Sequence, residues 1–174
     1  MFNLNRVVPW LGPVNTENMG KVMTDLIKLH KEDQEALITL VIMTSGGSSP
    51  VGFGFYDLIR EMKIPLNTVG TGFVDSMGVI IFLAGERRFV TPHTSMFIHE
   101  SRRYFQEKET VTERDARANQ EESGLYKGFY SGIVQERTGG KIVPTKLEDM
   151  MLRNTILNPD QMIELGIAHE LWTH

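Results

Sequence analysis

The chain has no cysteine, so neither a disulfide framework nor a cysteine-ligated metal site can support its fold. It also lacks a long apolar run, because residues 36–43 and 79–84 fall far short of the ~20 residues that cross a bilayer. No basic segment followed by an apolar one opens the sequence, so we predict no secretory signal. A soluble, cytoplasmic protein is the expectation, since a reducing compartment suits a chain without cysteine.

An excess of positive charge is missing as well. The formal net charge is −4, and no basic patch of the kind that nucleic acids require is apparent. The length of 174 residues suits one domain with one core, so we expect a single domain over residues 1–174. Neither a nucleic acid nor a membrane is expected as a partner, and no metal or organic cofactor is expected.

Two hydrophobic periodicities alternate along the first half of the chain. Residues 38–43 form a continuous apolar run of the buried-strand type, whereas Met19, Val22 and Leu26 share one stripe of a helix. Strands that alternate with helices at this spacing imply right-handed crossovers and a mostly parallel sheet, so the fold class is α/β. The predicted order is a strand over 6–12, a helix capped by Asn15 or Thr16, a strand over 36–44, a helix over 50–62, a strand over 66–71, a helix after Ser76, and a strand over 95–99.

The composition changes in the second half. Residues 102–122 contain eleven charged side chains of both signs, which predicts a solvated helical face and not a basic binding patch. Residues 125–134 continue this helix with an apolar stripe. A last helix is predicted between Asn158 as its N-cap and Gly166 as the residue that ends it.

The stretch over 68–85 predicts a strand that turns sharply into a buried helix, with Ser76 at the bend. This serine would lie beside amides that have no intrahelical partner, at the positive end of the helix dipole. Taken alone, Ser76 is better explained as a helix N-cap than as a nucleophile. The glycine pair 46–47 after a buried strand and His99 at the end of another strand shift the interpretation toward a nucleophile.

These segments carry a resemblance to a known family. Gly46-Gly47 after a strand, then Ser76-Met77-Gly78, then Ile98-His99 resemble the proteolytic subunit of the caseinolytic (Clp) proteases, and the match is collinear over about 6–171. The resemblance implies the ββα spiral of the Clp and crotonase superfamily, with a projecting handle helix at about 101–140. Further matching residues are Tyr56, Asp57, Ala84, Gly85, Arg88, Phe89 and Pro92.

The resemblance implies a serine endopeptidase that hydrolyses unfolded or short peptides through an acyl-enzyme. Such chemistry needs a nucleophile, a base and donors for the developing oxyanion. By the family pattern Ser76 is the nucleophile and His99 the base, and the amides of Gly47 and Met77 form the oxyanion hole.

The sequence does not decide which residue takes the place of the acid in the triad. Counting back from the glycine that ends the last helix places Asn154 at the family's acid position. An asparagine can orient a histidine, but it cannot stabilise the imidazolium by charge, and exchanging the acid for Asn in a serine protease costs ~10⁴ in kcat. A triad of low turnover with Asn154 is our first interpretation; Asp149 after a register shift is another, and a catalytically weak subunit is the third. Asp75 stands where the family has a small residue, and it either opposes ionised intermediates, points away or helps to cap the helix.

The family assembles into stacked heptameric rings, so we expect a homo-oligomer up to a tetradecamer. Only five residues precede the first predicted strand. The family carries there an axial loop that gates the pore toward an AAA+ unfoldase, so such an unfoldase is a possible partner that the sequence does not imply. The family's glycine-rich strand after the histidine is replaced here by residues 102–106, which leaves substrate register and ring pairing open. The rival interpretations are an inactive regulatory ring subunit and, less favoured, a crotonase-like acyl-CoA enzyme.

Overall fold

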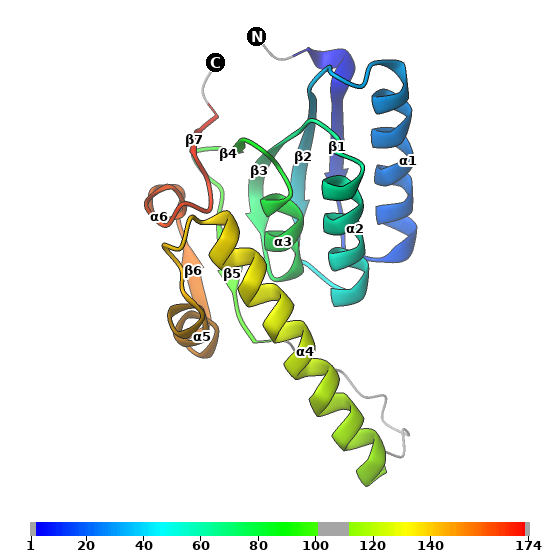
Figure 1. Cartoon of the computed structure of the whole chain (residues 1–174). Coiled ribbons are helices and arrows are strands. Elements are labelled where there is room, and N and C mark those ends of the chain that lie inside the picture. The colour runs from blue at the N-terminus through cyan, green and yellow to red at the C-terminus, as the bar shows by residue number, and fades with distance from the viewer. Residues whose placement is uncertain (1–2, 101–111, 173–174) are drawn as a thin grey trace.

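The computed structural model describes residues 3–100 and 112–172 (Figure 1). Its first half alternates strands with helices, and its second half is mainly helical. The elements in chain order are η1 (Leu4–Arg6), β1 (Val7–Leu11), α1 (Thr16–Glu32), β2 (Ile38–Thr44), α2 (Ser49–Glu61), β3 (Leu66–Val74), α3 (Met77–Leu83), β4 (Arg88–Val90), β5 (Met96–Ile98), α4 (Glu113–Arg137), α5 (Pro144–Leu152), β6 (Thr155–Leu157), α6 (Pro159–Glu164) and β7 (Glu170–Leu171).

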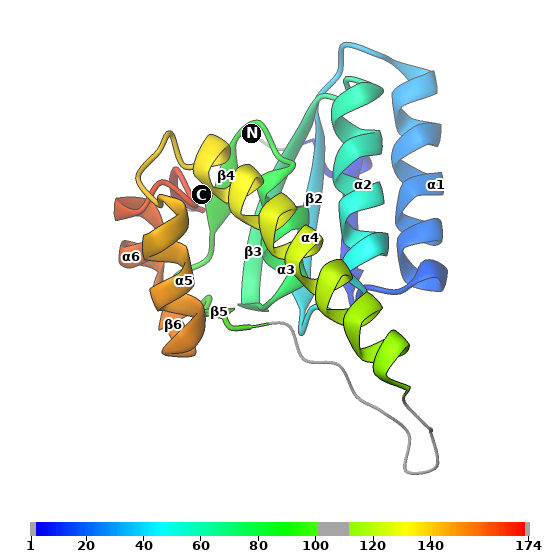
Figure 2. The ribbon, with the colours of Figure 1, turned by 60° about the horizontal axis from the view of Figure 1, so that its bottom comes forward.

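Five strands form one sheet in the order β1-β2-β3-β4-β7, and every neighbouring pair is parallel. This confirms the predicted α/β fold with a parallel sheet. Parallel neighbours cannot be joined by tight hairpins, so helices carry the chain back between them. Figures 1 and 2 show α1 and α2 side by side, and α3 packs between α2 and α4. The strands β5 and β6 pair antiparallel in a small second sheet.

The apolar runs account for the centre of the sheet. Ile38, Leu40 and Ile42 of β2 are fully buried on one face of the sheet, and Val41 and Met43 on the other face are half-buried. The strand β3 runs three residues beyond the predicted end at residue 71. Gly72 adopts a φ of 61°, and the register between β2 and β3 shifts there, so that Val74 pairs with Thr44. This irregularity carries the chain directly into the turn at Ser76.

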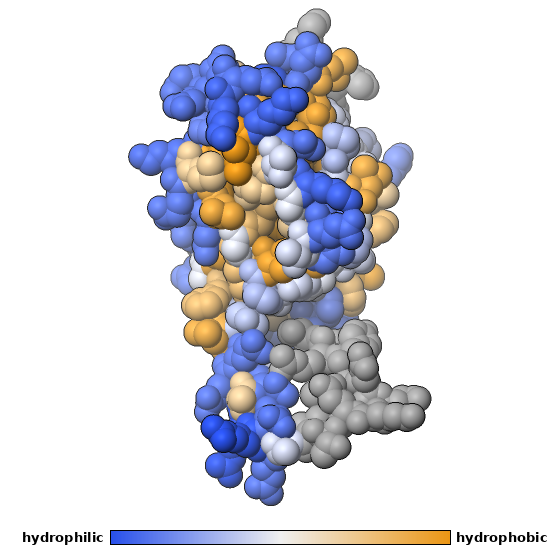
Figure 3. All heavy atoms as spheres, turned by 90° about the vertical axis from the view of Figure 1, so that its right-hand side faces the viewer, coloured by the Kyte–Doolittle hydropathy of each residue, from blue (hydrophilic) through white to orange (hydrophobic). Residues whose placement is uncertain are grey.

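The helix α4 begins with a capping box, in which the side chains of Thr112 and Asp115 each bond the other's backbone amide. Among its side chains only Tyr130 and Val134 are buried, in its C-terminal half. Figure 3 shows hydrophilic side chains around its projecting end, in agreement with the charged face predicted there. Of the predicted handle region, residues 101–111 lie outside the described residues, as does the segment 102–106 that replaces the family's glycine-rich strand.

Arg88 joins the sheet to the C-terminal segments. Its side chain in β4 is only 3% exposed, and burial lowers its pKa to about 10. The guanidinium donates to the carbonyl oxygens of Ile167 at 2.6 Å, Arg137 at 2.8 Å, Gly166 at 3.0 Å and Gly85 at 3.3 Å. One side chain thus satisfies carbonyl groups at the ends of α4 and α6 and after α3.

We expect Arg88→Ala to lower the free energy of unfolding by ~3 kcal/mol or more, because buried carbonyls lose their donors and a cavity forms. The measurement is urea denaturation. Arg87→Ala is the matched control: Arg87 is exposed and pairs with Glu170 at the surface, so this variant should lose less than ~1 kcal/mol. Equal losses in the two variants would contradict a structural role for the buried guanidinium.

Candidate active site

Ser76 lies in a strained turn between β3 and α3. Its φ of 55° and ψ of −122° are rarely adopted by a residue with a side chain. The same kind of strained strand-to-helix turn presents the nucleophilic serine in α/β-hydrolases. Ser76 occupies the N-cap position of α3, but its side chain makes no capping hydrogen bond. The N-cap explanation therefore does not account for the hydroxyl.

Three elements hold this turn in place. The amide of Ser76 donates to the carbonyl of Phe97 at 2.8 Å, and the amide of Asp75 donates to the carbonyl of Thr44 at 2.9 Å. From α4, the hydroxyl of Tyr130 donates to the carbonyl of Ser76 at 3.2 Å. Burial raises the pKa of Tyr130, so the phenol stays protonated and able to donate. Together β2, β5 and α4 support the strained backbone of the serine.

The loop after β2 approaches the turn so closely that it requires glycine. Gly46 has a φ of 84°, and a Cβ added there would lie 2.7 Å from both the carbonyl oxygen of Asp75 and the Cβ of Ser76. A Cβ on Gly47, whose φ is 146°, would lie 2.4 Å from the carbonyl oxygen of Val14. The glycine pair thus lies in close contact with the chain after β1 on one side and with the serine turn on the other, where a side chain would clash.

His99 follows directly after β5 and lines the same cavity as Ser76. Its imidazole stacks on the ring of Phe97, with centroids 4.7 Å apart and an interplanar angle of 18°. No hydrogen bond joins Ser76 to His99 in the part of the chain that the structure describes, and such bonds are often long before substrate binds. The Nδ1 atom of His99 is buried and has no hydrogen-bond partner among the described residues.

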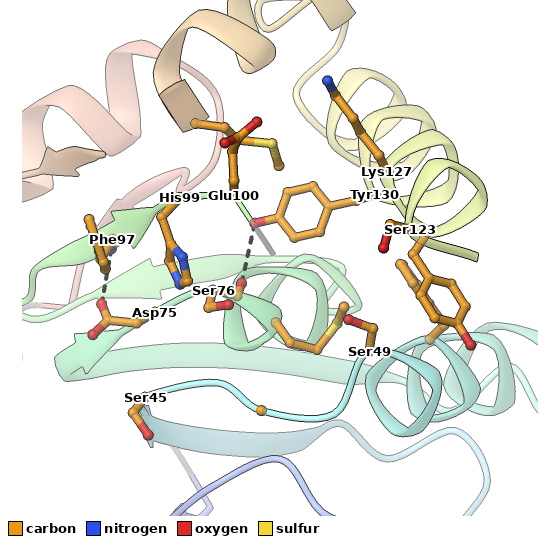
Figure 4. Close-up of a pocket in the computed structure, with 15 residues that line it drawn as sticks. Ser45, Ser49, Asp75, Ser76, Phe97, His99, Glu100, Ser123, Lys127 and Tyr130 are labelled. Carbon is orange, nitrogen blue, oxygen red and sulfur yellow. Dashed lines mark hydrogen bonds between the residues drawn. The ribbon is translucent and has the colours of Figure 1, made fainter. Parts of the chain in front are cut away.

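The cavity has a volume of about 600 Å³ and contains the candidate site (Figure 4). Its walls come from the glycine loop, the serine turn, the end of β5, and the helices α2, α4 and α5. The aromatic rings of Phe53 and Tyr126 lie 5.7 Å apart on one wall. The lining residues are Ser45, Gly47, Ser49, Phe53, Asp75, Ser76, Met77, Phe97, His99, Glu100, Ser123, Tyr126, Lys127, Tyr130 and Met151.

Asn154 is not among the residues that line the cavity. It lies in the turn between α5 and β6, is exposed, and has a φ of 52°, a conformation that asparagine tolerates better than most residues. Because Thr155 pairs with Ile98, Asn154 follows in register next to His99, yet no hydrogen bond between these two side chains occurs among the described residues. The turn geometry by itself explains an asparagine at this position.

The alternative acid Asp149 lies on the exposed face of α5. Its carboxylate accepts a hydrogen bond at 2.8 Å from Nε of Arg153, one helical turn away. It is also absent from the cavity lining. The structure thus gathers Ser76, His99, Gly47 and Met77 around one cavity, and among the described residues neither Asn154 nor Asp149 makes a hydrogen bond to Nδ1 of the imidazole.

Asp75 lies beside the nucleophile and lines the cavity. Its half-buried carboxylate does not cap α3; Oδ1 accepts a hydrogen bond at 2.9 Å from the amide of Phe97 on β5 (Figure 4). Burial raises the pKa of Asp75, while the bond from Phe97 and the charge of His99 act in the opposite direction. Sequence reasoning recognised Asp75 as unusual, but it did not foresee its bond to the histidine strand.

Sequence reasoning missed Tyr130 altogether. Tyr126 and Tyr130 are one helical turn apart on α4, so their spacing places both on one face of that helix. The spacing alone does not reveal that this face covers the serine turn. Within residues 3–100 and 112–172, no group of three or more His, Asp or Glu side chains could hold a metal ion. No helix of those residues is long and apolar enough to cross a membrane.

Comparison with known proteins agrees with this geometry. The family model described as Clp protease matches residues 1–174. A curated relative, ATP-dependent Clp protease proteolytic subunit 2 of Thermobifida fusca (strain YX), is 35% identical over 100 residues, which cover 56% of this chain and 49% of that protein. The matched part thus spans about half the length of this relative. The resemblance predicted from the sequence is confirmed: the chain belongs to the Clp protease family.

Proposed function

We propose that the chain is a serine peptidase subunit that hydrolyses unfolded or short peptides through an acyl-enzyme. The observation that carries this proposal is the strained turn that presents the uncapped hydroxyl of Ser76 to the cavity lined by His99. The combination of φ 55° and ψ −122° lies outside the allowed regions for a non-glycine residue, and such strained conformations cluster at functional sites. Membership of the Clp protease family supports the same chemistry.

In the proposed reaction, Oγ of Ser76 attacks the carbonyl carbon of the scissile peptide while the imidazole of His99 takes its proton. The imidazolium then returns this proton to the leaving amine as the C–N bond breaks, and the acyl group stays on Ser76. Water, deprotonated by the same imidazole, attacks the ester carbonyl. As the ester C–O bond breaks, the imidazolium returns this proton to Oγ of Ser76, which releases the acid and restores the serine. Each proton is thus accounted for by one histidine.

The oxyanion that forms in each step needs fixed donors. The amides of Gly47 and Met77 are our candidates, since both residues line the cavity together with Ser76. Met77 opens α3, so its amide has no partner within the helix. Removing one such donor in a serine protease costs about 3–4 kcal/mol of transition-state stabilisation.

Membership of the family supports a proposal about assembly and partners. The relative from Thermobifida fusca is named as the proteolytic subunit of an ATP-dependent protease, and it matches part of this chain. We therefore propose that this chain forms rings that enclose the sites, and that an AAA+ unfoldase delivers unfolded substrates to them. Light scattering of the purified chain, alone and with a candidate unfoldase, would measure both associations.

The test of the chemistry is covalent labelling with a fluorophosphonate probe, followed by intact-protein mass spectrometry. We expect one adduct on the native chain and none on Ser76→Ala. Ser49→Ala is the matched control, because Ser49 lines the same cavity and should leave labelling in place. Asn154→Asp should label faster, because its register position would bring a carboxylate beside His99.

One observation favours a second candidate, a ring subunit without peptidase activity. The Nδ1 atom of His99 has no partner among the described residues, and Asn154 lies outside the cavity lining. Absence of an adduct on a folded, assembled native chain would overturn the peptidase proposal in favour of this candidate. A single adduct that depends on Ser76 would exclude it.

A further inference from the structure

The candidate site contains a carboxylate, that of Asp75, which has no role in the reaction proposed above. That reaction needs a negative charge near the histidine, because the imidazole becomes a cation when it takes the serine proton. Neither Asn154 nor Asp149 supplies this charge inside the cavity. Asp75 is the acidic residue nearest to the nucleophile in the chain, and it lines the cavity together with Ser76 and His99.

Two hydrogen bonds hold Asp75 between β2 and β5, the strand that precedes the histidine. Its amide donates to the carbonyl of Thr44 at 2.9 Å, and its carboxylate accepts from the amide of Phe97 at 2.9 Å. Phe97 precedes His99 by two residues, and its ring stacks on the imidazole. Asp75, Ser76 and His99 line the same cavity, and Figure 4 shows the carboxylate of Asp75 turned toward Phe97, to which it is hydrogen-bonded.

The electrostatic coupling is consistent with this arrangement. Burial raises the pKa of Asp75, and the charge of His99 acts in the opposite direction, so a charged imidazole favours the ionised carboxylate. Other charged groups near the site are Glu100, which follows His99 and is exposed, and Lys127 of α4, which pairs with Glu148 of α5. Asp75 is therefore the half-buried anion that responds to His99.

We infer that Asp75 is a positioning residue for His99. Held by the amide of Phe97, its carboxylate stabilises the imidazolium that forms when His99 takes the proton of Ser76, and so fills the role that Asn154 leaves open. The carboxylate stays ionised throughout and transfers no proton. This inference rests on the proposed function, because it gives His99 the role of the general base.

Asp75→Asn separates charge from structure, because the amide oxygen of asparagine can still accept the bond from Phe97. We expect the acylation rate to fall by roughly tenfold or more, since exchanging the acid of a complete triad for Asn costs ~10⁴. We also expect the acid limb of the pH–rate profile to move to lower pH, because the imidazolium loses its stabilising charge. Asn154→Asp in the Asp75→Asn background should restore part of the rate.

A second readout does not depend on activity. The pH dependence of hydrogen exchange at the ring C–H of His99, followed by mass spectrometry, reports the midpoint of its protonation in the assembled protein. Asp75→Asn should move this midpoint to lower pH. Glu100→Gln, which removes an exposed and solvent-screened carboxylate next to His99, should move it less.

The possible results separate the two claims. A native chain that acylates, with the exchange midpoint and the rate unchanged in Asp75→Asn, would overturn the role of Asp75 and leave the peptidase proposal intact. A faster Asp75→Asn variant would also overturn it, since the carboxylate would then oppose catalysis. A native chain that does not acylate but whose His99 midpoint shifts in Asp75→Asn would overturn the peptidase proposal while supporting the coupling of Asp75 to His99.

Discussion

Replacing His99 by alanine is expected to lower the rate of Ser76 acylation about a thousandfold or more, with the protein still folded. The hydroxyl of Ser76 is a weak nucleophile at neutral pH, and it depends on a base to take its proton. The strained turn and the glycine loop remain in His99→Ala, so binding and the oxyanion donors survive. In serine proteases that lack a triad member, these two contributions leave a residual catalysis of about 10³–10⁴ over water.

The measurement is the second-order rate constant for labelling by a fluorophosphonate, determined beside hydrolysis of a short fluorogenic peptide. His93→Ala is the matched control, because His93 is exposed in the turn between β4 and β5, away from the cavity lining. We expect this control to keep the native rate. If His99→Ala retained the native labelling rate, His99 could not be the base, and the acid–base part of the proposed mechanism would be wrong.

The fold could be predicted largely because its sheet is built from continuous apolar runs. In β2, Ile38, Leu40 and Ile42 are fully buried on one face, and Val41 and Met43 on the other face are half-buried, so the strand can be recognised by its continuous hydrophobicity. The capping box at Asn158 and the left-handed Gly166 likewise confirmed the predicted last helix, since local side chains decide both ends. Features that depend only on neighbouring residues can therefore be predicted from a single sequence.

The helix α5 was not predicted, although the local sequence contains signals for it. Pro144 stands at its first turn, and Leu147, Met150 and Met151 form its buried face at helical spacing. This signal was present in the sequence, but the helix was not predicted. The small antiparallel pair of β5 and β6 is a different case, because its partners are separated by more than fifty residues and the pairing depends on tertiary packing.

In the candidate site, too, features set by the local sequence could be predicted and features set by tertiary packing could not. Ser76, His99 and the glycine pair could be proposed from the sequence because the order of their segments resembles the pattern of the Clp family. The orientation of Asp75 toward Phe97 and the bond from Tyr130 to Ser76 could not, since they depend on how β5 and α4 pack against the turn. Asn154 could be located by counting, but counting cannot tell whether its side chain faces the histidine.

The second large effect concerns the glycine loop. Gly46→Ala is expected to lower the acylation rate about a hundredfold or more, within the range that loss of an oxyanion donor causes. A Cβ at this position would lie 2.7 Å from the Cβ of Ser76 and 3.0 Å from the amide nitrogen of Met77, so the loop or the turn must move. The φ of 84° adds strain for any residue with a side chain.

Urea denaturation of the same variant separates lost chemistry from lost folding. We expect Gly46→Ala to unfold more easily by ~1–3 kcal/mol and to stay folded in buffer, since overpacking costs about this much. Gly54→Ala is the matched control: Gly54 lies on the exposed face of α2, nothing lies within 4 Å of an added Cβ, and alanine favours helix. Native labelling by folded Gly46→Ala would show that the serine turn tolerates displacement of the loop, and the oxyanion donors would then have to be sought elsewhere in the cavity.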